Sequence, residues 1–305
     1  MPNQPSPSGQ APVPGWIAAS LLVLIAVVFS SNHVAARLAF DHGVSILTAV
    51  TVRSASTALV VLVLVIVSGV SLRLSRLTLA RAGIVGLFIT VQSYCLYAAV
   101  ARLPVALALL TFNTFPIVIA LLSWALGGER PRRRTLVAMP VIFCGLALAL
   151  DAFKWIGQGR LPGTDALAGV AFALGASVSF GSAMVLTQQW LGQVDGRLRS
   201  ALTMAVVAVI TFAVGATGEG FHLPTDSTGW VGLALLTLLY GTAITALFVL
   251  LPRIGAVNNS PIMNIEPIAA MVIAWLALGQ SVGPAQIVGA LMVVGAIIFL
   301  SSGRR

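Results

Sequence analysis

Long apolar stretches, separated by short polar breaks, run through most of this sequence. Each stretch is close to the roughly 20 residues that an α-helix needs to cross the hydrocarbon core of a bilayer. The breaks carry Gly, Pro, Ser and Arg, which are typical of loops at helix ends. We therefore predict ten membrane-spanning helices, over residues 16–38, 45–68, 82–101, 104–126, 135–151, 166–190, 198–217, 229–251, 257–278 and 283–302.

The composition agrees with this pattern. Of the 305 residues, 58% are hydrophobic and only 8% are charged, whereas soluble domains carry about 25% charged residues. So few charges cannot cover a water-facing surface, so we expect the lipid bilayer as solvent. Spanning segments then satisfy their backbone groups within helices. The predicted fold class is an all-α integral membrane protein.

The net charge of +9 raises the question of a nucleic-acid partner. The basic residues are scattered through short loops and form no nucleic-acid motif, so we expect no such partner. Cys95 and Cys144 lie in predicted spans without CxxC spacing, which indicates packing residues. We expect no cofactor and no metal site.

The Lys and Arg residues in the loops predict the orientation. With a cytoplasmic N-terminus, the inside loops hold 12 of them against 4 outside. The inside set is Arg73, Arg76, Arg81, Arg130, Arg132, Arg133, Arg134, Arg197, Arg199, Arg253, Arg304 and Arg305, and the outside set is Arg37, Arg102, Lys154 and Arg160. The positive-inside rule then places both termini in the cytoplasm, in a multi-pass protein of the inner membrane.

Residues 1–15 are uncharged and rich in Pro, Ser and Gly, so we expect a disordered tail rather than a signal peptide.

The chain also repeats itself at an offset of 151 residues. The matched pairs include Asn113 with Asn264, Pro116 with Pro267, Trp124 with Trp275, and Gly128 with Gly279. This register predicts one repeat over residues 16–151, an external linker over 152–165 and a second repeat over 166–302. Each repeat then holds five of the predicted spans. Because five is an odd number, the second repeat enters the membrane in the opposite orientation to the first. Inverted repeats recur in secondary transporters, with the substrate site near the midplane between them.

Several segments resemble the EamA-type branch of the drug/metabolite transporter superfamily. They are "FSSNHVAARLAF" with Arg53 in the next span, "GGERP" after span four, and "RIGAVNNSPIMNIEPIAAMVIAWLALGQ". The sequence departs from the family pattern at Gln280, where the family often has Glu, and at Phe115, where Glu-Pro would match the second repeat. The resemblance implies ten spans and transport of amino acids, other metabolites or drugs.

Two Asn residues, each three residues before a proline, lie at equal depth in related spans. Pro116 and Pro267 donate no backbone N–H and clash with the carbonyl four residues back, so each marks a predicted kink. We interpret Asn113 and Asn264 as lining a central substrate cavity. Hydrogen bonding to a neighbouring helix is the alternative.

Other polar residues within the apolar stretches are further candidates for the cavity. Arg53 lies about eight residues into span two, where a cation needs water or a partner. It could attract an anion to the external mouth of the pathway or form a structural pair. Asn32 and His33 in span one, and Tyr94 and Tyr97 in span three, could contact substrate. Interhelical hydrogen bonding is again the alternative.

Glu266 is the one ionisable residue between Arg253 and Arg304. An ionised carboxylate within a span is costly, so it must become neutral, pair with a cation such as Arg253, or face a wet cavity. It could accept a proton or bind a substrate amine. A structural role in bracing span nine is the alternative.

These observations favour a secondary transporter of small organic solutes that works by alternating access, with export as the expected direction and protons as candidate coupling ions. The alternative is a non-transporting or enzymatic integral membrane protein. An enzyme needs a nucleophile–base pair, a metal cluster or paired acids. The chain has three histidines, of which His42 and His222 lie in loops, and no HExxH motif or phosphate-binding loop. We therefore do not expect an enzyme.

Overall fold

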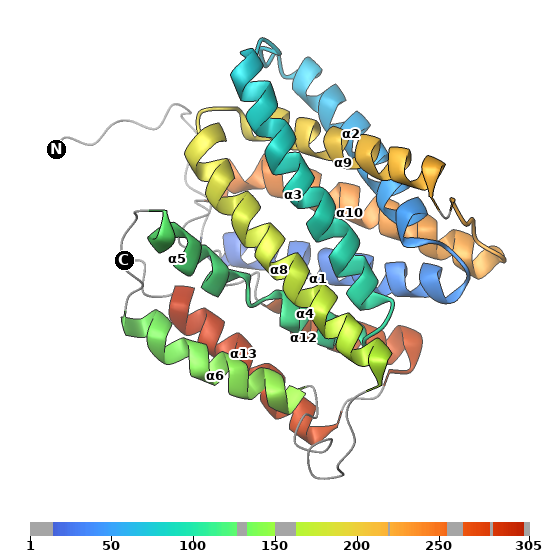
Figure 1. Ribbon diagram of the computed structural model, residues 1–305, viewed down its shortest axis with the longest axis vertical. Helices are drawn as coiled ribbons and strands as arrows, with labels where there is room; N and C mark the ends of the chain where they lie inside the picture. The colour runs from blue at the N-terminus through green and yellow to red at the C-terminus, as the bar shows by residue number, and fades with distance from the viewer. Residues whose placement is uncertain are drawn as a thin grey trace.

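The computed structural model describes residues 15–126, 133–149, 163–218, 220–254, 265–280 and 283–301. All regular secondary structure in these ranges is helical. The helices are α1 Gly15–Asp41, α2 Ile46–Val67, α3 Arg76–Val100, α4 Val105–Phe112, α5 Phe115–Ala125, α6 Arg133–Ala149, α8 Thr164–Leu191, α9 Gly196–Thr217, α10 Ser227–Ile254, α12 Glu266–Leu278 and α13 Pro284–Ser301 (Figure 1).

Every predicted span contains at least one of these helices. Seven helical segments are long and apolar enough to cross a membrane, with α4 and α5 together counted as one of them. The described parts of α6, α12 and α13 are shorter apolar helices. The predicted all-α membrane fold is therefore confirmed, while ten complete crossings remain a prediction.

Capping side chains explain where several helices begin. Ser45 accepts a hydrogen bond from the backbone N–H of Thr48 at the start of α2, and Ser75 accepts one from Thr78 at the start of α3. Asp195 accepts one from the N–H of Arg197 at the start of α9. Each bond satisfies a backbone donor that has no partner within the helix.

The span predicted over residues 104–126 is broken rather than kinked. Helix α4 ends at Phe112, and α5 begins at Phe115 with Pro116 in its first turn. Asn113 closes α4 by donating its side-chain amide to the carbonyl of Leu109, at 2.8 Å. A proline in the first turn of a helix loses no hydrogen bond, so the chain restarts there instead of bending. Pro267 has the same place in the first turn of α12.

The helix boundaries repeat at the offset found in the sequence. Arg76 and Ser227 begin α3 and α10, and they are 151 residues apart. The same offset separates Phe115 from Glu266, which begin α5 and α12, and it separates the first residues of α6 and α13. The two halves of the chain therefore use equivalent elements.

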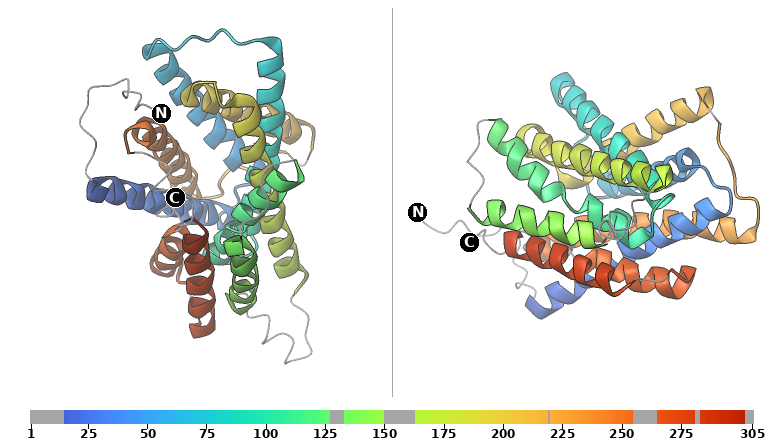
Figure 2. Two further views of the ribbon diagram at one scale, coloured as in Figure 1. Left: turned by 90° about the vertical axis from the view of Figure 1, so that its left-hand side faces the viewer. Right: turned by 60° about the horizontal axis from the view of Figure 1, so that its bottom comes forward.

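The two halves pack through pairs of helices that cross from one repeat to the other. Helix α1 packs on α10, α2 on α9, α3 on α8 and α6 on α13 (Figures 1 and 2). The pairing is antiparallel: Gly169 near the start of α8 lies against Leu103 just past the end of α3, and Thr51 in α2 bonds Thr211 near the end of α9 at 2.8 Å. At the 151-residue offset α1 corresponds to α8, and α3 corresponds to α10. The pair α1–α10 therefore corresponds to the pair α3–α8, and the halves are related by a pseudo-two-fold axis.

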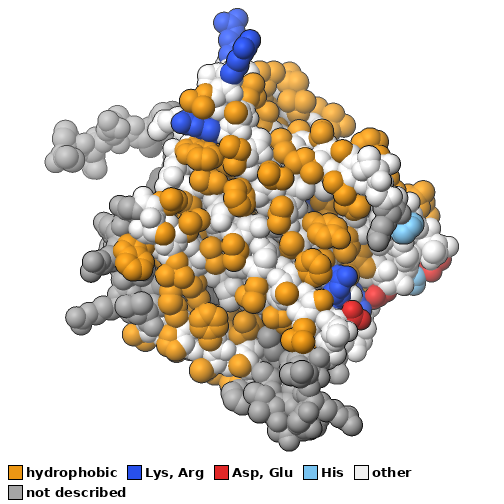
Figure 3. All heavy atoms as spheres, in the orientation of Figure 1, with side chains coloured by type: hydrophobic (Ala, Val, Ile, Leu, Met, Phe, Trp, Pro, Cys, Tyr) orange, Lys and Arg blue, Asp and Glu red, His pale blue; other side chains and the backbone are white. Residues whose placement is uncertain are grey.

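The outer face of the bundle is apolar between its ends. In Figure 3 hydrophobic side chains are spread over the visible face, while Lys and Arg lie at the top and, together with acidic and His side chains, at the right-hand edge. Large side chains such as Leu59, Val67, Phe212 and Leu276 are exposed. An exposed apolar surface of this extent is suited to contact with lipid acyl chains.

Candidate functional site

Polar side chains from several helices meet inside the bundle. We name them the Arg53 cluster. It consists of Asn32 and His33 on α1, Arg53 and Ser54 on α2, Ser93 and Tyr97 on α3, Tyr240 on α10, and Glu266 on α12. Asn32 and Tyr97 are fully buried, and Arg53 is 3% exposed. So much buried polarity in a membrane bundle is costly and marks a functional candidate.

Arg53 lies between two tyrosine rings. Its guanidinium carbon is 4.6 Å from the ring centroid of Tyr97 and 3.9 Å from that of Tyr240. One terminal nitrogen donates to the hydroxyl of Ser93 at 3.0 Å. No carboxylate in the described part of the chain forms an ion pair with Arg53. The ring faces stabilise the cation, but they supply no counter-charge.

Tyr97 connects Arg53 to α1. Its hydroxyl donates to the side-chain oxygen of Asn32 at 3.2 Å. The imidazole of His33 meets the Tyr97 ring edge-on, with ring centroids 6.0 Å apart. A single buried tyrosine therefore contacts the guanidinium, the amide and the imidazole.

Glu266 lies at the start of α12 and faces α1. Its carboxylate Oε1 is 3.4 Å from Nε2 of His33, and its backbone carbonyl accepts a hydrogen bond from Ser30 at 2.8 Å. A negative charge in the first turn of a helix is favoured by the helix dipole. The side chain of Arg253, the partner suggested by the sequence, lies outside the described residues, so His33 is the partner that the structure shows.

Four atoms of the cluster are buried without a hydrogen bond. Within the described residues, Nδ2 of Asn32, Nδ1 of His33, Nε of Arg53 and Oγ of Ser54 have no partner. Buried polar groups in native structures are nearly always bonded, so each such atom calls for an explanation. The amide and the guanidinium nitrogen are donors only, and the hydroxyl can donate.

The structure brings together five of the predicted site residues: Asn32, His33, Arg53, Tyr97 and Glu266. It places two others elsewhere. Tyr94 is 38% exposed and packs edge-on against Phe172, and Asn113 bonds within its own helix. Asn264 lies outside the described residues. Pro116 and Pro267, which were predicted as kinks, lie in the first turns of α5 and α12.

Sequence reasoning missed Ser54, Ser93 and Tyr240. Tyr240 carried a usable signal, because the chain has only three tyrosines and this one lies in the middle of an apolar stretch. The two serines carried none, since small hydroxyl residues are common in membrane helices. In the described residues, no group of three or more His, Cys, Asp or Glu could hold a metal ion.

The symmetry-related position in the other half is apolar. At the offset of 151, Asn32, His33, Arg53 and Glu266 correspond to Ala183, Met184, Met204 and Phe115. Phe115 packs against Phe180 and Phe112, with centroids 4.9 Å and 5.4 Å away. The repeats therefore share a backbone arrangement, but the polar cluster lies on one side only.

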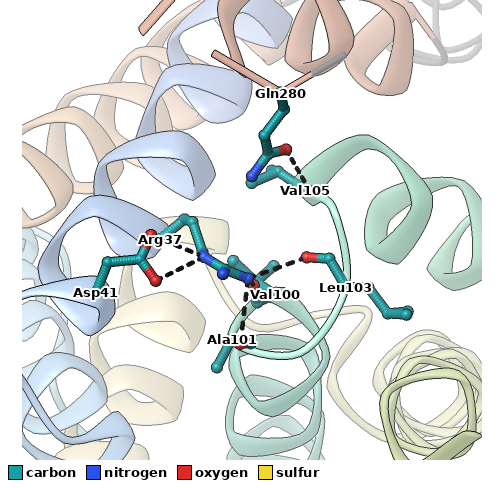
Figure 4. A network of polar contacts seen from close by, with 7 residues as sticks. All are labelled: Arg37, Asp41, Val100, Ala101, Leu103, Val105 and Gln280. Carbon is teal, nitrogen blue, oxygen red and sulfur yellow. Dashed lines mark hydrogen bonds and ion pairs between the residues drawn. The ribbon is translucent and has the colours of Figure 1, made fainter. Parts of the chain in front are cut away.

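A second polar network lies at the end of the bundle where α1 and α3 finish (Figure 4). Arg37 binds the carboxylate of Asp41 at 2.9 Å and donates to the carbonyls of Val100, Ala101 and Leu103. Gln280 accepts a hydrogen bond from the N–H of Val105 at 3.2 Å, at the start of α4. These contacts satisfy free backbone groups at the end of α3 and the start of α4, which indicates a structural role.

Comparison with known proteins adds to this geometry. The chain matches the EamA-like transporter family over residues 16–150 and 167–302. It is 28% identical over 213 residues to the threonine/homoserine exporter RhtA of Escherichia coli K12, a match covering 70% of this chain and 66% of the exporter. An uncharacterized transporter of Archaeoglobus fulgidus is 27% identical over 217 residues, which is 69% of this chain and 72% of that protein. A solved crystal structure shares the fold with a TM-score of 0.63 at 19% identity, covering 93% of this chain and 97% of the other.

Proposed function

Because this chain belongs to the EamA-like transporter family, we propose that it is a secondary transporter that exports small organic metabolites by alternating access. The observation that carries the proposal is the buried Arg53 cluster, which is formed by helices of both repeats. Helices α1, α2 and α3 belong to the first repeat, and α10 and α12 to the second. A relative movement of the repeats would then change access to the cluster, as in other transporters built from repeats.

The proposed substrates are small amino acids and close derivatives. The relative in Escherichia coli exports threonine and homoserine, both of which carry a carboxylate, an ammonium and a hydroxyl. The Arg53 cluster offers a cation, an acid with its histidine partner, and hydroxyl and amide groups. This chemistry is suited to such a solute.

The proposed movement uses the prolines at the start of α5 and α12. The helix breaks after Phe112 and restarts with Pro116 in the first turn of α5, and Pro267 has the equivalent place in α12. A break leaves few backbone hydrogen bonds to resist bending, so these two points are candidate hinges. Asn113 and Asn264 precede the hinges, and we propose that they approach the pathway in another state of the cycle.

We propose an inner-membrane location with both termini in the cytoplasm, on the basis of the charge count in the loops.

The His33–Glu266 pair is the proposed proton site, because an imidazole and a carboxylate can both exchange protons and the two side chains are in contact. The alternative of an intramembrane enzyme has little support, since family members and relatives with assigned roles are transporters.

The experiment is counterflow in proteoliposomes. Purified protein is reconstituted with unlabelled L-threonine or L-homoserine inside, and entry of the labelled amino acid is followed with and without a pH gradient. We expect accumulation above that of protein-free liposomes, with a gradient effect on net transport. If neither amino acid exchanges, while the protein is folded and inserted, the proposed substrate class is wrong.

A further inference from the structure

Within the described residues, no carboxylate forms an ion pair with the buried guanidinium of Arg53. Arg53 is 3% exposed, and its contacts are two tyrosine ring faces and the Ser93 hydroxyl. The carboxylate of Glu266 is engaged with His33 instead. A buried charge with no opposite charge costs several kcal/mol, so an arrangement of this kind is retained where something else supplies the anion.

The unpartnered atoms of the cluster favour the same ligand. Nε of Arg53 and Nδ2 of Asn32 are buried, can only donate, and have no acceptor within the described residues. A cationic group would leave these donors unsatisfied. A neutral oxygen could accept from them but would leave the positive charge unpaired, whereas an anion both accepts hydrogen bonds and neutralises the charge.

We propose that Arg53 and Asn32, which both contact Tyr97, form the binding site for an anionic group of the substrate, and that this group is a carboxylate. The site supplies one permanent positive charge, which matches a singly charged acid. A phosphate, with nearly two charges, would leave the buried site negative. A planar carboxylate also fits the edge of a guanidinium whose two faces are covered by Tyr97 and Tyr240. This inference rests on the proposed transport function and names the group by which the substrate is bound.

The experiment compares probes that differ only in the groups they carry. Competition with labelled L-threonine counterflow is measured for L-threonine, L-threonine amide, 1-amino-2-propanol and 3-hydroxybutyrate. The amide and the amine lack the carboxylate, and 3-hydroxybutyrate keeps it while lacking the ammonium. We expect 3-hydroxybutyrate to compete, and the amide and the amine to compete about 10- to 100-fold less well than L-threonine, as for loss of a hydrogen-bonded charge.

Variants connect this preference to the site. Arg53→Gln should abolish competition by the acids, and Asn32→Ala should weaken it several-fold. Arg102→Gln is the matched control, because Arg102 also stacks on a ring, that of Phe172 at 5.0 Å, but it bonds the Ala98 carbonyl at the end of α3. Arg53→Lys keeps the charge without the planar edge, and it serves if Arg53→Gln does not fold. Thermal stability in detergent, with and without 3-hydroxybutyrate, gives a second reading of binding.

Several results would contradict the inference. Competition by the amide or the amine equal to that of L-threonine would show that no carboxylate is needed. Unchanged binding of 3-hydroxybutyrate by folded Arg53→Gln would remove Arg53 from the site, and unchanged binding by Arg53→Lys would exclude recognition of the carboxylate by the planar guanidinium edge. Stabilisation of the wild type by chloride, lost in Arg53→Gln, with no effect of 3-hydroxybutyrate, would identify an inorganic anion as the ligand. Absence of all L-threonine counterflow would instead count against the proposed function, and the inference would fall with it.

Discussion

At the scale of single residues, the pairing of charges inside the bundle decides the chemistry. Glu266 contacts a histidine, whose charge depends on pH, while Arg53 contacts aromatic rings and a hydroxyl. A histidine side chain can exchange a proton near neutral pH, whereas an arginine keeps its charge. This difference is why we propose proton exchange for the Glu266–His33 pair and anion binding for Arg53.

The proposed proton role of Glu266 is tested by the variants Glu266→Gln and Glu266→Asp. Glutamine cannot accept a proton, so we expect it to abolish transport driven by a pH gradient while exchange of labelled for unlabelled substrate continues. Aspartate should retain part of the gradient-driven rate. The readout is counterflow against gradient-driven flux over a range of internal and external pH. Wild-type pH dependence in the glutamine variant would leave Glu266 with a structural role.

A second residue-scale prediction concerns Asp226, in the loop before α10. The N–H of Gly229, followed by the side chain of His42 at 2.7 Å, lowers the pKa of the Asp226 carboxyl below its ordinary value. A carboxyl with a lowered pKa in the folded state stabilises the protein above its unfolded pKa of about 3.9. That stabilisation is lost as the pH falls through the lower, folded value. Asp226→Asn should therefore lower the melting temperature at pH 7, and the difference from wild type should shrink toward pH 3.

At the scale of helices, the sequence predicted well which segments are helical and where they lie, because a span must be apolar over a fixed length. The α4–α5 break was predicted only as a kink, since a proline pattern does not distinguish bending from restarting. The contacts of Tyr240 and Ser93 could not be predicted. The Tyr240 contact depends on how α10 packs on α2 across the repeats, and the Ser93 contact on how α3 lies beside α2. Single-helix patterns contain neither arrangement. The gathering of Asn32, His33, Arg53, Tyr97 and Glu266 was expected only in outline.

The contact between α6 and α13 gives the prediction at this scale. A Cβ atom added to Gly289 would overlap the carbonyl oxygen of Gly145 and the backbone nitrogen of Ala149. Gly289→Ala should therefore push the helices apart and destabilise the protein by about 1–3 kcal/mol. Gly295→Ala on the same helix is the control, because nothing lies within 4 Å of its added Cβ. Equal melting temperatures for the two variants would contradict the close approach.

At the scale of the whole molecule, two similar halves have become chemically different. The antiparallel pair α1–α10 corresponds to the antiparallel pair α3–α8 at the 151-residue offset, so the backbone is nearly symmetric. The polar residues are not symmetric, since Phe115, Phe112 and Phe180 occupy the place opposite to Glu266 and its neighbours. In the proposed mechanism, the symmetric backbone would provide two equivalent states for the movement, while the one polar cluster would provide the specificity.

The inverted arrangement makes a prediction about equivalent loops. Ser71 and His222 are 151 residues apart, and both side chains are exposed, before α3 and before α10 respectively. If the second repeat is inverted, these matched positions lie on opposite sides of the membrane. In a background without Cys95 and Cys144, Ser71→Cys should react with an impermeant thiol reagent only from the cytoplasm, and His222→Cys only from outside. Gly157→Cys and Ser227→Cys should also react from outside, as the charge count requires. Reaction of Ser71→Cys and His222→Cys from the same side would exclude inversion, and with it the alternating-access scheme that depends on it.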